Sequence, residues 1–145
     1  MSGAIRQALG ISSFMRIESE HLSFDVEPAQ LVDYLSIVPH FEHLLPADQI
    51  SAFVATDSSC SFTVKGNIPI SFSLVESHPT HLRFESGKTS PFRFSLVLQL
   101  EPTTTGCTGR FVFEADVNGF MKLLIEKPLL KLANEMAQRL QHELR

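Results

Sequence analysis

Apolar and polar residues alternate along the chain from Ile50 to Val117, and this alternation limits the fold more than any other feature. Most apolar residues between positions 52 and 100 stand at even numbers, Ala52 and Val54 among them. Because successive side chains of a β-strand point to opposite faces, the pattern predicts strands with one apolar and one polar face. The even positions, Ala52 and Val54 included, are expected to face a core.

Turn-forming segments divide this region into six strands. Even-numbered residues of paired strands share a face only if the hairpin loops have odd length, which predicts loops of three residues. The result is an antiparallel meander with one face for a core and one for solvent. The turn segments are residues 57–59, 65–67, 78–80, 87–90 and 102–106.

The meander is preceded by a strand and two short helices. Alternation from Met15 to Val26 predicts the strand, and Pro28 is suited to open a helix because its missing N–H would be unpaired there anyway. A second short helix is expected from Pro39 to Pro46. Residues 1–14 are expected to be an extension that the domain can lose, with Met15 as an alternative start.

Residues 120–144 predict a long amphipathic helix. Charged side chains recur at every fourth position from Lys127 to Glu143, and apolar side chains face the other way. Pro128 should kink this helix unless the residues before it form a separate segment. Because a one-sided sheet and a one-sided helix can bury their apolar surfaces on each other, we predict an α+β domain.

Size and charge exclude several classes of function. With 145 residues, 43% of them hydrophobic, the chain can build one core without disulfides or metal. A net charge of −4 supplies no positive field for nucleic acid. Cys60 and Cys107 stand alone, so no metal or cofactor is predicted. No secretory signal and no apolar run of about 18 residues is present, so we expect a cytoplasmic protein without stable membrane insertion.

The order of strand, two short helices, six strands and long helix resembles the helix-grip fold of the START-like or SRPBCC superfamily, in a small bacterial form. The resemblance covers the chain from about Met15 to the end and is carried by residues 41–46, 116–120 and 126–129. It implies a curved seven-stranded antiparallel sheet that grips the last helix around an elongated cavity. Relatives include polyketide cyclase-like enzymes and lipid or quinone carriers, so the fold does not choose a function.

The resemblance implies the cavity, and because the inward positions are almost entirely apolar, the cavity would suit a small hydrophobic or amphipathic ligand that is bound without catalysis. Entry is expected near the short helices and before Pro128. The other possibility is that the aromatic rings fill the core completely. The expected ligand-binding residues are Phe62, Ile70, Phe72, Leu74, Phe84, Phe94, Leu96, Phe111, Phe113, Met121, Leu124 and Ile125.

Two glutamates in the first strand leave an alternative open. Ile17 is out of phase with the apolar residues after it, so either a bulge near residues 19–21 turns Glu18 and Glu20 outward, or both carboxylates face the cavity. Inside, mutual repulsion and burial would raise one pKa and create an acid/base pair for a cyclase-like or dehydratase-like enzyme. A third class is a protein-binding adaptor with a filled core and an exposed apolar patch.

Histidines occur as two close pairs. His40 and His43 lie one helical turn apart and could hold a metal if a third ligand came from elsewhere, but nothing requires one. His78 and His81 are expected to be solvated at a hairpin tip. The outward apolar residues are few, and if they are grouped they would favour a homodimer. They are Phe53, Val75, Val97 and Val112.

Overall fold

The computed structural model describes residues 13–144. Most of the expected extension at residues 1–14 therefore lies outside the described part, and the first strand begins at Ser13. In chain order the elements are β1 (Ser13–Glu18), β2 (Leu22–Phe24), α2 (Pro28–Ser36), the 3₁₀ helix η1 (Val38–His43), β3 (Ile50–Ala55), β4 (Ser59–Val64), β5 (Ile68–His78), β6 (His81–Ser86), β7 (Arg93–Pro102), β8 (Cys107–Val117) and α3 (Gly119–Glu143).

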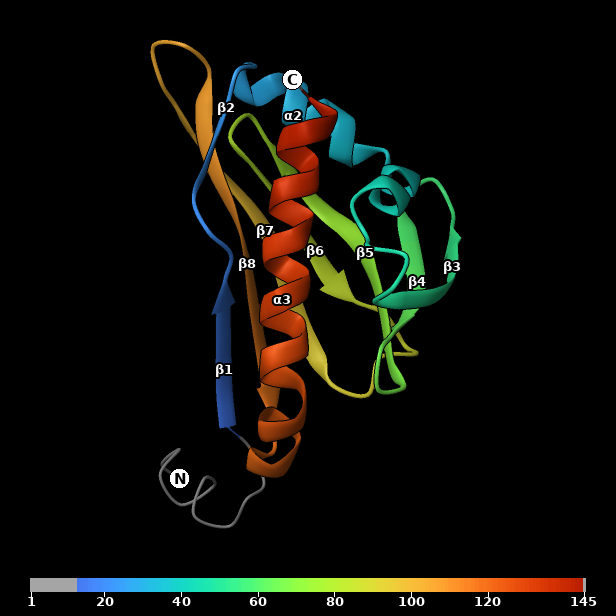
Figure 1. Ribbon diagram of the computed structural model, residues 1–145. Helices are drawn as coiled ribbons and strands as arrows, with labels where there is room; N and C mark the ends of the chain where they lie inside the picture. The colour runs from blue at the N-terminus through green and yellow to red at the C-terminus, as the bar shows by residue number, and fades with distance from the viewer. Residues whose placement is uncertain (1–12, 145) are drawn as a thin grey trace.

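One antiparallel sheet holds all the strands. Its order is β1-β8-β7-β6-β5-β4-β3, and the short β2 also pairs with β8, beyond the end of β1. The sheet curves, α3 runs along its inner side, and α2 and η1 close one end (Figure 1). The predicted α+β class and the helix-grip architecture are confirmed, with the expected first strand divided into two.

Ser19 causes that division. Its backbone N–H donates to the carbonyl of Phe111 over 2.9 Å, and its hydroxyl accepts from the Phe111 N–H over 2.8 Å. The break shifts the phase of the strand, so that Ile17 before it and Phe24 after it are both buried. The predicted bulge is therefore confirmed, and it turns Glu18 and Glu20 outward.

The β5–β6 hairpin keeps the sheet in phase by a different means than expected. His78 pairs with His81, so the loop has two residues and not three. A bulge at Val75, between the paired residues Leu74 and Glu76, supplies the missing residue. Leu82 and Phe84 of β6 consequently still face the core.

The first and last hairpins depart from the predicted odd spacing. Ala55 pairs with Cys60, which leaves four residues between them, and a bulge in β3 compensates. Ala52 has a φ of 58° there, so Phe53 turns inward while Ala52 and Val54 are exposed; the prediction that these two residues face the core is wrong. The last hairpin also has four loop residues, after which the inward positions of β8 have odd numbers.

The four apolar residues expected to face outward do not form one patch. Phe53 is half-buried and its ring lies 6.3 Å from that of Phe62. Val75 is exposed at the bulge, whereas Val112 is buried and pairs with half-buried Val97 across β7 and β8. The condition stated for a homodimer, that these residues are grouped on the surface, is therefore not met.

Helix α3 follows the predicted amphipathic pattern. The side chain of Asn118 caps it by accepting from the Met121 N–H over 2.7 Å, and the helix continues through Pro128 as one element. The face toward the sheet is buried from Ile125 to Leu140. The charged side chains lie on the other side of the helix, as expected.

Candidate functional site

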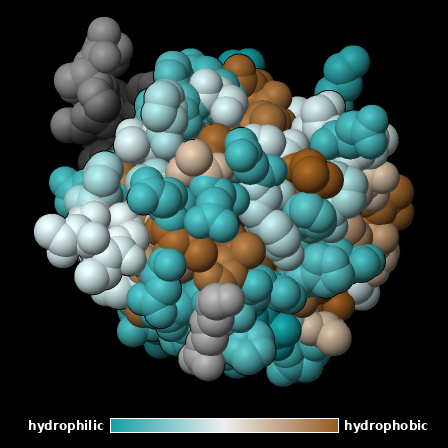
Figure 2. Space-filling model, turned by 90° about the horizontal axis from the view of Figure 1, so that it is seen from above, coloured by the Kyte–Doolittle hydropathy of each residue, from teal (hydrophilic) through white to brown (hydrophobic). Residues whose placement is uncertain are grey.

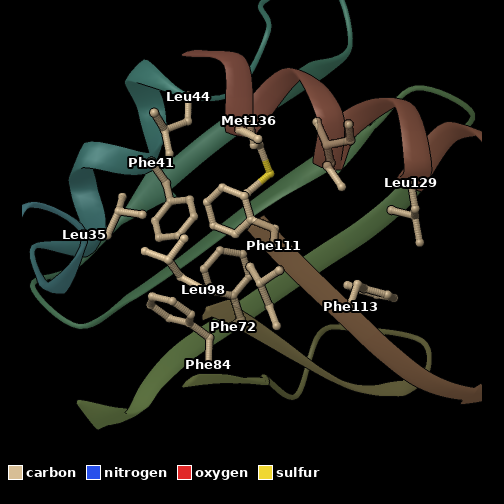
Figure 3. Packing of buried hydrophobic residues seen from close by; sticks show 14 of the residues in the cluster. Leu35, Phe41, Leu44, Phe72, Phe84, Leu98, Phe111, Phe113, Leu129 and Met136 are labelled. Atoms are coloured by element: carbon tan, nitrogen blue, oxygen red, sulfur yellow. The ribbon is translucent and has the colours of Figure 1, made fainter. Parts of the chain in front are cut away.

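Aromatic rings fill much of the space inside the sheet, and Phe72 of β5 lies at their centre. Its ring meets those of Phe41 at 5.1 Å and Phe84 at 5.4 Å in edge-to-face contacts. Phe62 and Phe94 lie 6.1 Å and 6.5 Å from it. Such perpendicular contacts are the favoured geometry of aromatic pairs. Figure 3 shows Phe41, Phe72 and Phe84 of this cluster between the short helices and the sheet.

A small apolar cavity lies beside this cluster, between the sheet and the middle of α3. Its volume is about 30 Å³. Figure 3 shows Leu129 and Met136 of α3 above the sheet residues Phe72 and Phe113. The cavity is lined by Phe62, Ile70, Phe72, Phe94, Leu96, Phe113, Leu129, Leu132, Ala133 and Met136. Every one of these side chains is apolar.

Six of the twelve predicted ligand-binding residues line this cavity. They are Phe62, Ile70, Phe72, Phe94, Leu96 and Phe113. The four lining residues of α3 are absent from the prediction, although they lie on the same helical face as Ile125, and that periodicity could have indicated them.

The other six predicted residues lie elsewhere. Phe84, Phe111 and Ile125 are buried in the core outside the cavity lining. Leu74 and Met121 are half-buried, and Leu124 is exposed to 57% on the outer side of α3. Met121 borders a separate surface hollow next to Phe92 and Asn118.

The cavity is too small for a ligand in this conformation. Pockets that hold drug-sized ligands measure about 300–1,000 Å³, whereas 30 Å³ is close to the share of one water molecule in the liquid. An apolar void of this size has no polar partner to hold a water. The elongated cavity implied by the resemblance is therefore closed, because the rings and the α3 side chains fill it.

The two candidate carboxylates lie outside the cavity. Glu18 accepts one hydrogen bond, from Arg16 at 2.7 Å, and forms an ion pair with Arg110 at 3.0 Å. The hydrogen bond from Arg16 lowers the pKa of Glu18, with the charges of both arginines adding to it. Glu20 accepts from the Gln138 amide over 2.9 Å on the exposed side. The two do not form the interior acid/base pair.

Among residues 13–144, no ionisable side chain lines the cavity. Burial raises the pKa of the Cys60 thiol to about 12, which keeps it protonated and a poor nucleophile. Burial also raises the pKa of Cys107, and the charge of Glu27 adds to this. The arrangement can bury an apolar group, but its lining has no acid, base or nucleophile.

The outer side of α3 carries exposed apolar residues in its first turns. Phe120 is exposed to 73% and Leu123 to 81%, and Leu124 lies beside them at helical spacing. Lys127 and Lys131 continue the same face. At the opposite end of the molecule, near α2 and the C-terminal end of α3, the surface is mostly hydrophilic with small separate apolar patches (Figure 2).

His40 and His43 do not converge on a common point. Their ring centroids lie 6.2 Å apart, and the His40 ring stacks on Tyr34 at 4.2 Å. Nδ1 of His40 lies 2.7 Å from the carbonyl oxygen of Tyr34, which engages one of its two possible ligand atoms. Contacts with Tyr34 therefore hold the His40 ring in place.

No protein-family model and no curated protein sequence matches this chain. Solved structures of the same fold do match, and the three described here share little sequence with this chain. The KanY protein has a TM-score of 0.71 at 12% identity, over 91% of this chain and 98% of its own. Norcoclaurine synthase from Thalictrum flavum, solved in complex with dopamine and hydroxybenzaldehyde, has a TM-score of 0.60 at 13% identity, over 95% and 91%.

A third match has two domains. The di-domain ARO/CYC protein StfQ of the steffimycin biosynthetic pathway has a TM-score of 0.63 at 10% identity, over 90% of this chain and 51% of its own. These similarities establish a shared helix-grip fold. In residues 13–144, none of the helices has the length and apolar composition needed to cross a membrane.

Proposed function

We propose, from the helix-grip fold that this chain shares with these structures, that it binds a small hydrophobic or amphipathic molecule between the sheet and α3. A lipid, a quinone or a polyketide-like compound has the required chemistry, and we propose that it is bound without being converted. The observation that carries this proposal is the wholly apolar lining of the cavity. Burial of apolar surface is worth about 25 cal/mol per Å².

Binding requires the cavity to open, and α3 has one end that is better suited to move. Pro128 has no N–H to donate to the carbonyl of Leu124, so the helix lacks one internal hydrogen bond at this point. Residues 119–127 are also those whose outer side is most exposed. We propose that these first turns move away from the sheet around Pro128.

The other end of α3 is held in place. Asn134 accepts from the backbone N–H of Glu20 over 2.8 Å, and Gln141 donates to the carbonyl of Ser23 over 2.7 Å. Together with the hydrogen bond from Gln138 to Glu20, these contacts hold the second half of α3 against the β1–β2 link and β2. Opening at the first half would bring Met121 and Ile125 to the ligand together with the ten lining residues.

The test uses one substitution that fills the cavity. Ala133→Phe places a ring in the void and should prevent binding, while Ala29→Phe makes the same change on the exposed side of α2. Purified proteins are incubated with a bacterial lipid extract, re-isolated, and the bound small molecules are identified by mass spectrometry. The proposal requires an apolar compound with wild type and Ala29→Phe and much less of it with Ala133→Phe. Absence of any such compound from the wild-type protein would contradict it.

A protein-binding adaptor is the second candidate, favoured by the closed interior together with the exposed residues Phe120 and Leu123. In an adaptor, Leu123→Ser would weaken binding of the partner protein and Ala133→Phe would not change it. In a ligand carrier, Ala133→Phe would weaken ligand binding and Leu123→Ser would not. The cyclase-like alternative has no support from the site, because both glutamates lie outside it.

A further inference from the structure

The tip of the β5–β6 hairpin brings two histidines face to face. His78 and His81 are the last cross-strand pair before the two-residue turn at Pro79 and Thr80. Directly opposed residues of an antiparallel pair point to the same side of the sheet. The two imidazole rings accordingly stack, with centroids 4.1 Å apart and planes at 23°.

Glu76 adds a carboxylate on the same side. It lies two residues before His78 in β5, and its Oε2 is 3.3 Å from Nε2 of His78. One ligand atom from each of Glu76, His78 and His81 can be chosen so that all three lie within 4.8 Å of one another. Two imidazole nitrogens and one carboxylate oxygen therefore converge at one point of the surface.

The bulge at Val75 makes this convergence possible. In the rest of β5 the even positions face the core, as Phe72 does. After the bulge, the even-numbered Glu76 and His78 lie opposite Arg83 and His81 of β6, on the outward side. Without the extra residue, the two strands would place these donors on different faces.

We propose that Glu76, His78 and His81 form a binding site for a divalent transition-metal ion of the Zn²⁺ type. Two imidazoles and a carboxylate suit Zn²⁺, Cu²⁺ or Ni²⁺, whereas Mg²⁺ and Ca²⁺ prefer all-oxygen ligands. Ligand bonds of about 2.0–2.1 Å around a tetrahedral ion require donor atoms about 3.4 Å apart. The three side chains are exposed or half-buried, so they can rotate to bring their donor atoms from within 4.8 Å of one another to this shorter distance.

The neighbouring charges leave the site accessible to a cation. Arg83 is the nearest competitor, with its Nη1 at 3.7 Å from Glu76, but its shorter ion pair, 3.0 Å, is with Glu85. Three protein donors leave a fourth position for water or an outside ligand. The site lies on the outward face of the sheet and does not depend on the proposed ligand cavity.

Titration of the full-length protein with Zn²⁺, followed by isothermal calorimetry, tests the proposal. We expect one ion per chain at micromolar affinity, an at least 100-fold loss in the double variant His78→Ala, His81→Ala, and a loss of about tenfold in Glu76→Gln. The double variant His40→Ala, His43→Ala is the matched control, because it removes two imidazoles at the same sequence spacing. Co²⁺ absorption in the visible range reports tetrahedral coordination directly, and circular dichroism confirms that each variant is folded.

Two results would overturn the site. One is that wild-type protein binds no Zn²⁺ more tightly than about 100 μM. The other is that the His40 and His43 control loses as much affinity as the hairpin variant. In either case the hairpin histidines are solvent-exposed side chains only.

Discussion

Leu132→Ala is the substitution that most directly tests how α3 packs on the sheet. Leu132 is buried and lines the cavity, so its truncation adds the vacated side-chain space to the existing 30 Å³. Leucine-to-alanine changes in packed cores cost about 2.7–5.0 kcal/mol, rising by about 24 cal/mol per Å³ of void left behind. We expect about 4 kcal/mol, because the cavity already present shows that the surroundings do not collapse.

The assays are urea unfolding and thermal unfolding, both monitored by circular dichroism, with and without benzene. In a domain of 145 residues, 4 kcal/mol corresponds to a fall in Tm of roughly 12–16 °C. An enlarged apolar void stays dry and can bind benzene, which at 100 times its Kd would restore about 2.7 kcal/mol. Wild-type protein, whose void measures only about 30 Å³, should gain less stability from benzene than the variant does.

Leu130→Ala is the matched control, since Leu130 is on the same helix but exposed to 41%. It should change the free energy of unfolding by no more than about 0.5 kcal/mol. If the two variants are equally stable, or if benzene fails to stabilise Leu132→Ala, then α3 does not pack on the sheet as described.

Two further predictions concern the edge of the sheet. Gly106→Ala should lower the free energy of unfolding in urea by about 2–4 kcal/mol, because a Cβ there would lie 2.1 Å from the carbonyl oxygen of Phe24. Gly66→Ala should lower it by about 1 kcal/mol, because Gly66 has a φ of 99° but a Cβ there would meet no atom within 4 Å. Equal effects of the two substitutions would contradict this prediction. Arg16→Gln should raise the pKa of Glu18 toward 4.5 in an NMR titration, because the hydrogen bond from Arg16 holds it lower. The stabilising effect of ionised Glu18 is present above its unfolded pKa and is lost as the pH falls through the folded pKa. An unchanged pKa of Glu18 in the variant would be evidence against the Arg16–Glu18 pair.

The fold could be predicted because it depends on patterns that repeat along the chain. Alternation located the six strands of the meander, and the spacing from Ile125 to Leu140 located the buried face of α3. The phase break at Ile17 predicted the bulge at Ser19. Each of these features depends on several residues that follow the same periodicity, so one exception among them does not change the prediction.

The interior could not be predicted in the same way. Whether rings such as Phe72 and Phe113 leave a ligand-sized space depends on side-chain rotamers and packing, on which alternation has no bearing. The bulge at Val75 involves a single residue and could not be predicted either. A three-residue loop without a bulge would give the same alternation as the observed two-residue loop with one. The convergence of His78 and His81 with Glu76 follows from that bulge, which is why the sequence indicated only a solvated loop.

The bulge in β3 also affects how molecules of this protein meet one another. β3 is the last strand on its side of the sheet, so its outer backbone groups have no strand beyond them within residues 13–144. Ala52, with its positive φ, interrupts that row and bends the strand. A second molecule therefore finds no straight edge at β3 on which to extend the sheet, and the bulge that turns Phe53 inward disfavours strand addition on this side of the molecule.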